Sequence, residues 1–482
     1  MKAVAAVSIG FALLAGCAVG PDYRRPEAAT MPAAYAGASG GWKIAQPRGQ
    51  FPKGDWWEIF GDHGLNALEA QASAANQELK AAAERFAQAR AALDITRAGL
   101  FPNLALSDPY TRQRVSPNAP LSTTGNAIGQ SSTYNDFAVP LDLGYEIDLW
   151  GRVRRSVESS RAQSEASADD LASVKLTIQA EVAVDYFSLR TLDSERSVLR
   201  SSIEVFGKSL ALTRNLRSGG VATDLDVAQA ETVLKTTQAQ LPAVTLQRAQ
   251  IQHALALLVG QPASSFQIAE AALSTVPPWI PAGLPSELLE RRPDISSAER
   301  RVAAANANIG VAKAAFFPAI QLNALAGFES VDSGSLFNWS SRYWAVGPSL
   351  TAPLFEGGRL RAGLQLTHAA YGEMVAAYRQ TVLTAFVEVE DSLAAQNLLA
   401  DQYEAESGAL SAARRQLELA NNRYRDGLDT FLEVATAEST ELNIEFSTVQ
   451  LRGQQLVAAV TLVKALGGGW QEAMEPHENK KI

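Results

Sequence analysis

The sequence predicts a mixed α and β membrane protein that arose by internal duplication. Three observations support this fold class. Three sequence patterns recur in the same order, long proline-free stretches keep helical spacing, and shorter stretches alternate apolar with small or polar residues. The chain of 482 residues has ample material for a sizeable core, and its net charge of −9 argues against a nucleic-acid surface.

The N-terminus has the pattern of a lipoprotein signal. A Met-Lys start is followed by an apolar run at 3–13, too short to span a bilayer, which takes about 20 residues. Small residues then precede Cys17, the only cysteine in the chain. Residues 14–17, Leu-Ala-Gly-Cys, resemble the bacterial lipobox, in which the cysteine receives diacylglycerol and becomes the new N-terminus. We therefore expect a signal peptide at 1–16, a lipid on Cys17 and an outer-membrane location. An ordinary signal with an incidental cysteine is the alternative.

The duplication is read from three pairs of matching segments. They are AGLFPNLALS (98–107) with AAFFPAIQLN (314–323), LWGRVR (149–154) with EGGRLR (356–361), and GGVATDLDVAQAE (219–231) with DGLDTFLEVATAE (426–438). The last two pairs are each separated by 207 residues. Chance does not give three such matches in one order.

The expected domain boundaries follow from these repeats. The first repeat covers 61–273 and the second covers 288–470, with a proline-rich linker at 274–287 between them. A lipid-anchored N-terminal segment at 17–60 precedes the first repeat, and a polar tail at 471–482 follows the second.

Each repeat is expected to contain one helix, two strands and a long helical hairpin. The first helix ends at a Phe-Pro pair, because proline has no N–H to donate. No proline occurs from Leu141 to Leu241 or from Leu354 to Glu475, and apolar residues keep helical spacing from Leu171 to Leu210. Helices of about 60 residues are predicted, roughly 90 Å long.

The strand prediction rests on alternation. At 136–148 the odd positions are apolar and the even positions are small or acidic, the pattern of a strand with lipid on one face and water on the other. We assign Val139 and Leu141 to lipid, and Ala138 and Asp142 to the water-filled side. The alternative is an amphipathic sheet packed on a soluble core.

Two further stretches show the alternation more faintly. They are residues 320–329 and 342–355, where Trp339, Tyr343 and Trp344 are candidates for an interfacial aromatic girdle. Four strands cannot close a transmembrane barrel, since the smallest have about eight, and open edges are not tolerated in lipid. Several chains must therefore share one barrel.

Four motifs carry a family resemblance. GYEIDLWGR, LLERRPDISSAERRVAAANANIGVAKAAFFP, LFEGGRLRAG and YRDGLDTFLEVATAESTEL closely resemble the TolC-like outer membrane factors, and the resemblance runs from about residue 20 to 470. The lipobox places the chain nearer the NodT- and OprM-like outer membrane efflux lipoproteins.

The resemblance implies a homotrimer. In that family, four strands from each chain close a twelve-stranded transmembrane β-barrel, and long helices continue it as a periplasmic α-helical barrel. It implies the outer membrane channel of a tripartite efflux pump that exports drugs or other small toxic compounds. The expected partners are a periplasmic adaptor (membrane fusion) protein and an inner-membrane pump. A duct for type I secretion and a periplasmic adaptor or scaffold lipoprotein are the alternatives.

The resemblance also nominates residues at the periplasmic tip. Its hairpin turns match Gly220 and Gly427, and its gate contact matches Tyr424 with Asp226. Glu433 matches an acidic ring, while a second ring acid of the family is replaced here by Thr436. Asp224 and Asp429 lie beside these positions, and all are candidate tip residues.

Enzyme chemistry is not expected. Residues 37–41 fit the G-x-S-x-G pattern, but Ser39 lies in a loop-like segment without the required strand and helix, so a hydrolase is a remote alternative. The four histidines, His63, His253, His368 and His477, are scattered, and we find no phosphate-binding loop. No metal or cofactor is therefore predicted.

Overall fold

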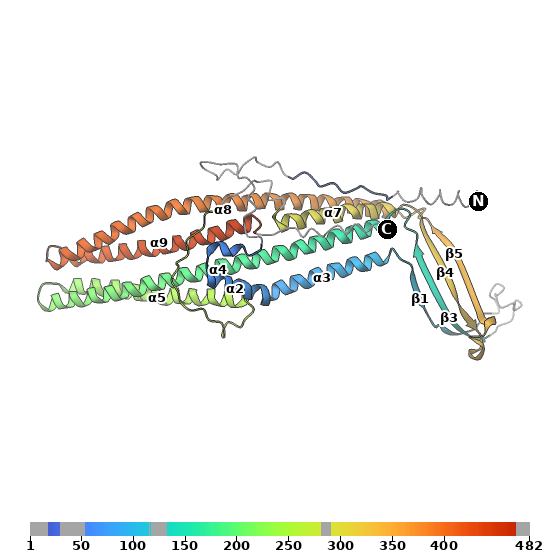
Figure 1. The fold of residues 1–482 in the computed structure, drawn as a ribbon, viewed down its shortest axis with the longest axis horizontal. Coiled ribbons are helices and arrows are strands. Elements are labelled where there is room, and N and C mark those ends of the chain that lie inside the picture. The colour runs from blue at the N-terminus through green and yellow to red at the C-terminus, as the bar shows by residue number, and fades with distance from the viewer. Residues whose placement is uncertain (1–17, 29–53, 115, 117–132, 281–290, 469–482) are drawn as a thin grey trace. The chain divides into compact units, whose positions relative to one another are not determined.

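The computed structural model describes residues 18–28, 54–114, 116, 133–280 and 291–468 (Figure 1). These residues form two compact units. The first unit contains the described residues up to Pro26 together with Ala87–Ala166 and Glu299–Ala377, and the second contains the rest. Each unit therefore takes segments from both expected repeats. Among the described residues no helix is long and apolar enough to cross a membrane.

The first unit holds one antiparallel sheet, whose strands lie side by side in Figure 1. Its strands are β1 (Asn103–Leu106), β2 (Tyr110–Arg114), β3 (Thr133–Glu146), β4 (Ala319–Ser330) and β5 (Arg342–Thr351). β1 and β2 both pair with β3, and the order across the sheet is β1-β3-β4-β5. The sheet therefore has four strand positions, two from each repeat, as predicted.

The helices repeat in matching lengths. α3 (Gln77–Ala98) and α7 (Pro293–Ala314) have 22 residues each, α4 (Arg152–Ser218) and α8 (Arg359–Arg425) have 67, and α5 (Asp224–Leu258) and α9 (Phe431–Ala465) have 35. The internal duplication is thereby confirmed. The prediction of helices of about 60 residues is also confirmed.

The two long helices begin at corresponding arginines, Arg152 and Arg359, and the local sequence explains the start of α4. Before α4, Gly151 has a φ of 79°, and the Asp148 carboxylate accepts hydrogen bonds from the backbone N–H groups of Val153 and Arg154 at 3.0 and 2.8 Å. Such bonds satisfy donors that a helix start leaves unpaired. Arg152 in turn donates to Glu146 at the end of β3, at 2.8 and 2.5 Å.

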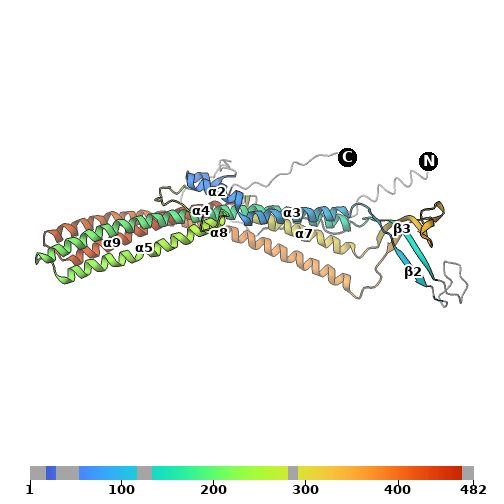
Figure 2. The same ribbon diagram turned by 90° about the horizontal axis from the view of Figure 1, so that it is seen from below.

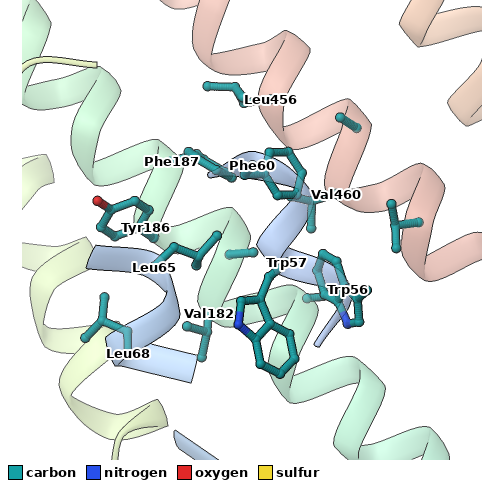
Figure 3. Close-up of a cluster of buried hydrophobic side chains, with 14 of the residues drawn as sticks. Trp56, Trp57, Phe60, Leu65, Leu68, Val182, Tyr186, Phe187, Leu456 and Val460 are labelled. Carbon is teal, nitrogen blue, oxygen red and sulfur yellow. The ribbon is translucent and has the colours of Figure 1, made fainter. Parts of the chain in front are cut away.

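Short elements of the second unit build its core. They are η1 (Trp56–Phe60) and α2 (His63–Ala75). Figure 3 shows Trp57, Phe60 and Leu65 packed between α4 and α9, against residues such as Phe187 and Leu456. The aromatic residues of η1 therefore belong to the hydrophobic core, although they fall within 17–60, which was expected to be the lipid-anchored N-terminal segment.

α2 is held by a single carboxylate. The Asp62 side chain accepts from the backbone N–H groups of Gly64 and Leu65, the Tyr186 hydroxyl at 2.7 Å and the Thr275 hydroxyl at 3.2 Å. These bonds cap α2 and attach it to α4 and to the segment after α5. α2, α4 and the segment around Thr275 are thereby held together.

One helix continues through a proline, which was not predicted from the sequence. Pro242 sits inside α5, which runs on to Leu258. A proline inside a helix removes one backbone hydrogen bond, so packing of α5 against α9 and the rest of the unit holds the helix through this position.

Candidate functional site

The cross-strand register sorts the sheet into two faces. Residues directly opposite in an antiparallel pair point to the same side. Leu141 lies opposite Leu106 on β1 and Ala326 on β4, and Ala326 lies opposite Trp344 on β5. The same side of the sheet carries the following apolar residues: Leu104, Val139, Leu143, Leu322, Phe328, Val346 and Leu350. The odd positions of β3 therefore belong to one continuous apolar face.

This apolar face is open in the single chain. Trp344 is 75% exposed, Leu106 69% and Val346 61%. The opposite side carries Asp142, Glu146, Gln321, Asn323 and Glu329. Large apolar groups exposed in a row opposite a polar face are the pattern of a lipid-facing sheet.

The aromatic girdle needs a correction. Trp344 lies on the apolar face, but Tyr343 is opposite Gly327 and so shares the polar face with Glu329. Neighbours along a strand point to opposite sides, so these two adjacent residues cannot both face lipid. Trp339, in the short helix η4 (Trp339–Ser341), is exposed and lies under the Arg342 guanidinium, 3.4 Å from the ring centre.

The outer edges of this sheet are unpaired among the described residues. Its outermost strands are β5 on one side and β1 with β2 on the other. An unpaired edge presents a row of free backbone donors and acceptors. Such an edge can be satisfied by pairing with a strand of another chain.

Both hairpin turns lie at the same end of the second unit (Figures 1 and 2). Gly220 and Gly427 end α4 and α8 in the left-handed conformation, with φ of 75° and 70°. The N–H of the residue after each glycine donates to the carbonyl five residues earlier, from Val221 to Leu216 and from Leu428 to Arg423, each at 2.9 Å. This is the Schellman motif, which favours glycine because positive φ strains other residues.

The apolar residues of the turns are repeated as well. Val221 and Leu428 are exposed, and so are Leu225 and Leu432, each pair separated by 207 residues. More than half of the surface of each of these side chains is exposed in the described chain.

The acidic residues of the turns have separate local roles. Asp224 pairs with Arg217 at 2.6 Å, and Asp429 pairs with Arg423 at 2.9 Å, so each turn is closed by an ion pair. The Asp226 carboxylate accepts from the backbone N–H and hydroxyl of Thr223 at 2.7 and 2.8 Å, forming a capping box on α5.

Glu433 holds the position that corresponds to Asp226 in the second repeat. It is exposed, and Thr430, the N-cap of α9, makes no side-chain capping bond. The two hairpins therefore differ at this point, and the Glu433 carboxylate is free to face solvent. Thr436 donates to the carbonyl of Leu432 at 2.8 Å and adds no charge to the turn.

Tyr424 lies under the second turn and is 8% exposed. Its ring packs edge-on against Phe431, with centroids 5.4 Å apart, and its hydroxyl lies near that of Thr213 without a well-formed hydrogen bond to any described residue. Burial and the charge of Asp226 raise the pKa of Tyr424, while the nearby Thr213 hydroxyl lowers it. Asp226 and Tyr424 are thus close enough to interact electrostatically, although no hydrogen bond joins them in this chain.

The sequence matches a known protein family in both of its halves. The family of outer membrane efflux proteins matches residues 68–261 and 284–468, one match in each half. The chain belongs to this family.

Three curated relatives of this outer membrane efflux protein are export proteins of pseudomonads. The pyoverdine export outer membrane protein OpmQ of Pseudomonas aeruginosa is 35% identical, with 86% of this chain and 87% of the relative aligned. The toluene efflux pump outer membrane protein TtgF of Pseudomonas putida is 35% identical, with 95% of each aligned. The solvent efflux pump outer membrane protein SrpC of P. putida is 36% identical over 95% and 96%.

Solved structures agree. The outer-membrane channel OprN matches with a TM-score of 0.87 and 32% identity, covering 95% of this chain and all of that chain. The open state of the Neisseria gonorrhoeae MtrE outer membrane channel matches with a TM-score of 0.81 and 29% identity, over 94% and 99%. The predicted family, fold class, efflux function and outer-membrane location of this efflux protein are thereby confirmed.

Some predicted positions of this efflux protein lie outside the described residues. They are Cys17, Ser39 and His477. His63, His253 and His368 are described, and no cluster of metal-binding side chains occurs in the described part of the chain.

Sequence reasoning missed a buried acid in the helical unit. Glu438 on α9 is 1% exposed and lies beside the apolar residues Val434 and Leu442. Burial raises its pKa to about 7, and a hydrogen bond with Ser209 opposes that rise. Its spacing of four residues from both apolar neighbours was the available signal, since residues four apart share a helix face.

Proposed function

We propose that three copies of this efflux protein form the exit duct of a tripartite pump. The observation that supports this most directly is the exposed apolar face of a sheet with two unpaired edges. Open edges are not tolerated in lipid, and four strand positions are too few to close a barrel. Pairing β5 of one chain with β1 and β2 of the next closes the sheet, and the resemblance gives the number as three.

The hairpin turns are the proposed contact with a periplasmic adaptor. They present Val221, Leu225, Leu428 and Leu432 to solvent around two glycine turns. Exposed apolar groups on a rigid turn suit a protein partner better than water. An inner-membrane pump, reached through the adaptor, supplies the energy.

The same turns are the proposed gate. We assign Tyr424 and Asp226 to a contact that holds the hairpins together, because they lie at the two neighbouring hairpin turns and the Asp226 charge influences Tyr424. We assign Glu433 to a ring of charge around the opening, because it is exposed and takes no part in capping α9. Asp224 and Asp429 hold the turns through their arginine partners.

Cys17 is the proposed attachment site for lipid, which anchors the chain in the outer membrane in addition to the barrel. The proposed cargo is small and organic, because relatives at 35% and 36% identity are named for toluene, solvent and pyoverdine export. These names favour small-molecule efflux over type I secretion of polypeptides.

The test is conductance of the purified protein. Trimers extracted in detergent are expected to form discrete channels in planar bilayers, whereas an adaptor or scaffold lipoprotein gives none. A monomer without conductance would refute the duct. Crosslinking in living cells then identifies the inner-membrane partner, and a peptide-exporting transporter there would favour secretion instead.

A further inference from the structure

The first described residues of the chain, Ala18–Tyr23, lie across two helices of the first unit. The Val19 N–H donates to the carbonyl of Trp150, just before α4, at 2.9 Å. The Asn306 side chain on α7 donates to the carbonyl of Pro21 at 3.0 Å. The segment is therefore bound to the start of α4 and to the side of α7 by its backbone.

Two side chains extend this attachment. Arg155 on α4, with only 7% of its side chain exposed, donates to Asp22 at 2.8 Å. The Tyr23 hydroxyl donates to Glu299 on α7, and the Tyr23 ring packs against a small alanine cluster of α4 and α7, namely Ala162, Ala303 and Ala304. A charge-assisted bond to a buried arginine and a half-buried aromatic ring both favour one position of the segment.

Glycines allow the close approach. A Cβ on Gly20, whose φ is 119°, would lie 2.5 Å from the Gly310 Cα, and a Cβ on Gly310 would lie 3.0 Å from the Val19 carbonyl oxygen and 2.8 Å from the Arg155 Cγ. A Cβ on Gly151, in the turn between β3 and α4, would lie 2.9 Å from the Ala18 Cα. Backbone thus meets backbone at Ala18–Gly20.

The two helices that this segment joins come from different halves of the duplication. α4 belongs to the first half and α7 to the second, and each begins or ends beside a membrane strand. A segment bound to both fixes their separation, and its first residue lies against the turn at Gly151.

We propose that Ala18–Tyr23 is a docking clasp that couples the anchored N-terminus to assembly of the channel. Docking holds α4 and α7 in register at their strand ends, which favours a sheet ready to pair with the next chain, and it brings the residue after Cys17 to the strand-to-helix turn. The proposal rests on the proposed trimer and on acylation of Cys17.

The test uses the full-length protein in cells. Gly310→Ala and Gly20→Ala are expected to undock the clasp, and Gly372→Ala on α8, whose added Cβ meets no atom within 4 Å, is the matched control. The readouts are labelled palmitate on the protein, the yield of heat-resistant trimer and trypsin cleavage after the exposed Arg24.

In the glycine variants we expect unchanged palmitate labelling and a lower yield of trimer. Trypsin should release the peptide 17–24 at least about tenfold faster than from wild type, because the cleavage rate follows the population of undocked segment. The proposal is overturned if both variants match wild type in trimer yield and cleavage, or if Gly372→Ala shows the same loss. If the glycine variants fail to accumulate, Tyr23→Phe replaces them, because it removes only the hydrogen bond to Glu299. It is expected to speed trypsin cleavage about 3-fold or more. If the wild-type protein carries no palmitate but its N-terminus still resists trypsin, acylation of Cys17 is refuted and docking of Ala18–Tyr23 is supported.

Discussion

Glu69 is a carboxylic acid inside the apolar core of the second unit. It lies on α2, is fully buried, and neither carboxyl oxygen has a hydrogen-bond partner among the described residues. Burial, with a smaller contribution from the Asp55 charge, raises the pKa of Glu69 to about 9. At neutral pH the side chain is therefore protonated, which is the less costly state of a buried acid.

This predicts that Glu69 makes stability depend on pH. The folded pKa exceeds the usual value of 4.5, so the folded chain binds one more proton between pH 4.5 and about 9. The contribution of Glu69 to stability is therefore fully present below pH 4.5 and falls by at most about 1.4 kcal/mol per pH unit through that window. Glu69→Gln is expected to raise the melting temperature, more at pH 8 than at pH 5, measured by circular dichroism. Glu84→Gln, at an exposed position of α3, is the control; an equal gain at both pH values would contradict the assignment.

Single residues were the least predictable part of the molecule. The tip positions could be named because they match a family motif, but their local partners could not be foreseen. Asp226, for instance, binds Thr223 in its own cap, and a cap depends on which residue begins the helix. Glu69 follows Leu65 by four residues and so falls on the buried face, a signal that was present in the sequence.

Among the elements, the two hairpins provide a built-in comparison. Thr223 caps α5 through its side chain, whereas Thr430 makes no such bond on α9. Thr223→Ala is expected to destabilise the first turn of α5 by about 1 kcal/mol, and Thr430→Ala by much less. Hydrogen exchange of the first-turn amides measures both. Equal acceleration in the two helices would show that the capping box adds nothing.

The facing of the sheet is tested on β3. Leu141→Arg places a charge on the apolar face and is expected to cost about 2–4 kcal/mol at the membrane midplane, with loss of folded trimer on semi-denaturing gels. Asp142→Arg, one residue along on the polar face, is expected to assemble. The reverse outcome would mean that the two faces are exchanged.

Strands and helices could be predicted because their periods are local properties of the sequence. The alternation at 136–148 anticipated β3, and the long proline-free stretches anticipated α4 and α8. Tyr343 was misplaced because an aromatic residue alone does not reveal its side of a strand, which depends on register. The passage of α5 through Pro242 depends on tertiary packing, which no local pattern encodes.

At the scale of the assembled channel, opening is the property to test. A hydrogen bond to a charged group contributes on the order of 1.5–3 kcal/mol, so three copies shift a closed-to-open equilibrium about a thousandfold or more. Tyr424→Phe with Asp226→Ala is expected to raise single-channel conductance and to sensitise cells to vancomycin. Tyr403→Phe, elsewhere on α8, is the control. If the double variant conducts like wild type, the contact that holds the channel closed lies elsewhere, and Asp224 and Asp429 are the next candidates.

Charge at the opening is separable from the gate contact. Glu433→Ala is expected to reduce cation preference, seen as a smaller reversal potential in a salt gradient, without a large rise in conductance. The reason is that Glu433 is exposed and holds no cap, so its loss removes charge but leaves the turn intact. An unchanged reversal potential would place Glu433 away from the pore axis.

The lipid anchor is tested at Cys17. Cys17→Ser is expected to abolish palmitate incorporation and to slow signal cleavage, while channel activity persists in the protein that reaches the membrane. Palmitate labelling that survives the substitution would refute the lipid site.

The equal lengths of α5 and α9 have an evolutionary consequence. Both run 35 residues from turn to core, and each added residue advances a helix by about 1.5 Å and rotates it by about 100°. An insertion in one copy alone would displace its turn and swing its buried stripe out of the packing. A change in helix length is therefore tolerated only when both copies change together. Natural variation in the length of these hairpins should then occur as paired insertions or deletions. Each should be of a size that restores the helical phase.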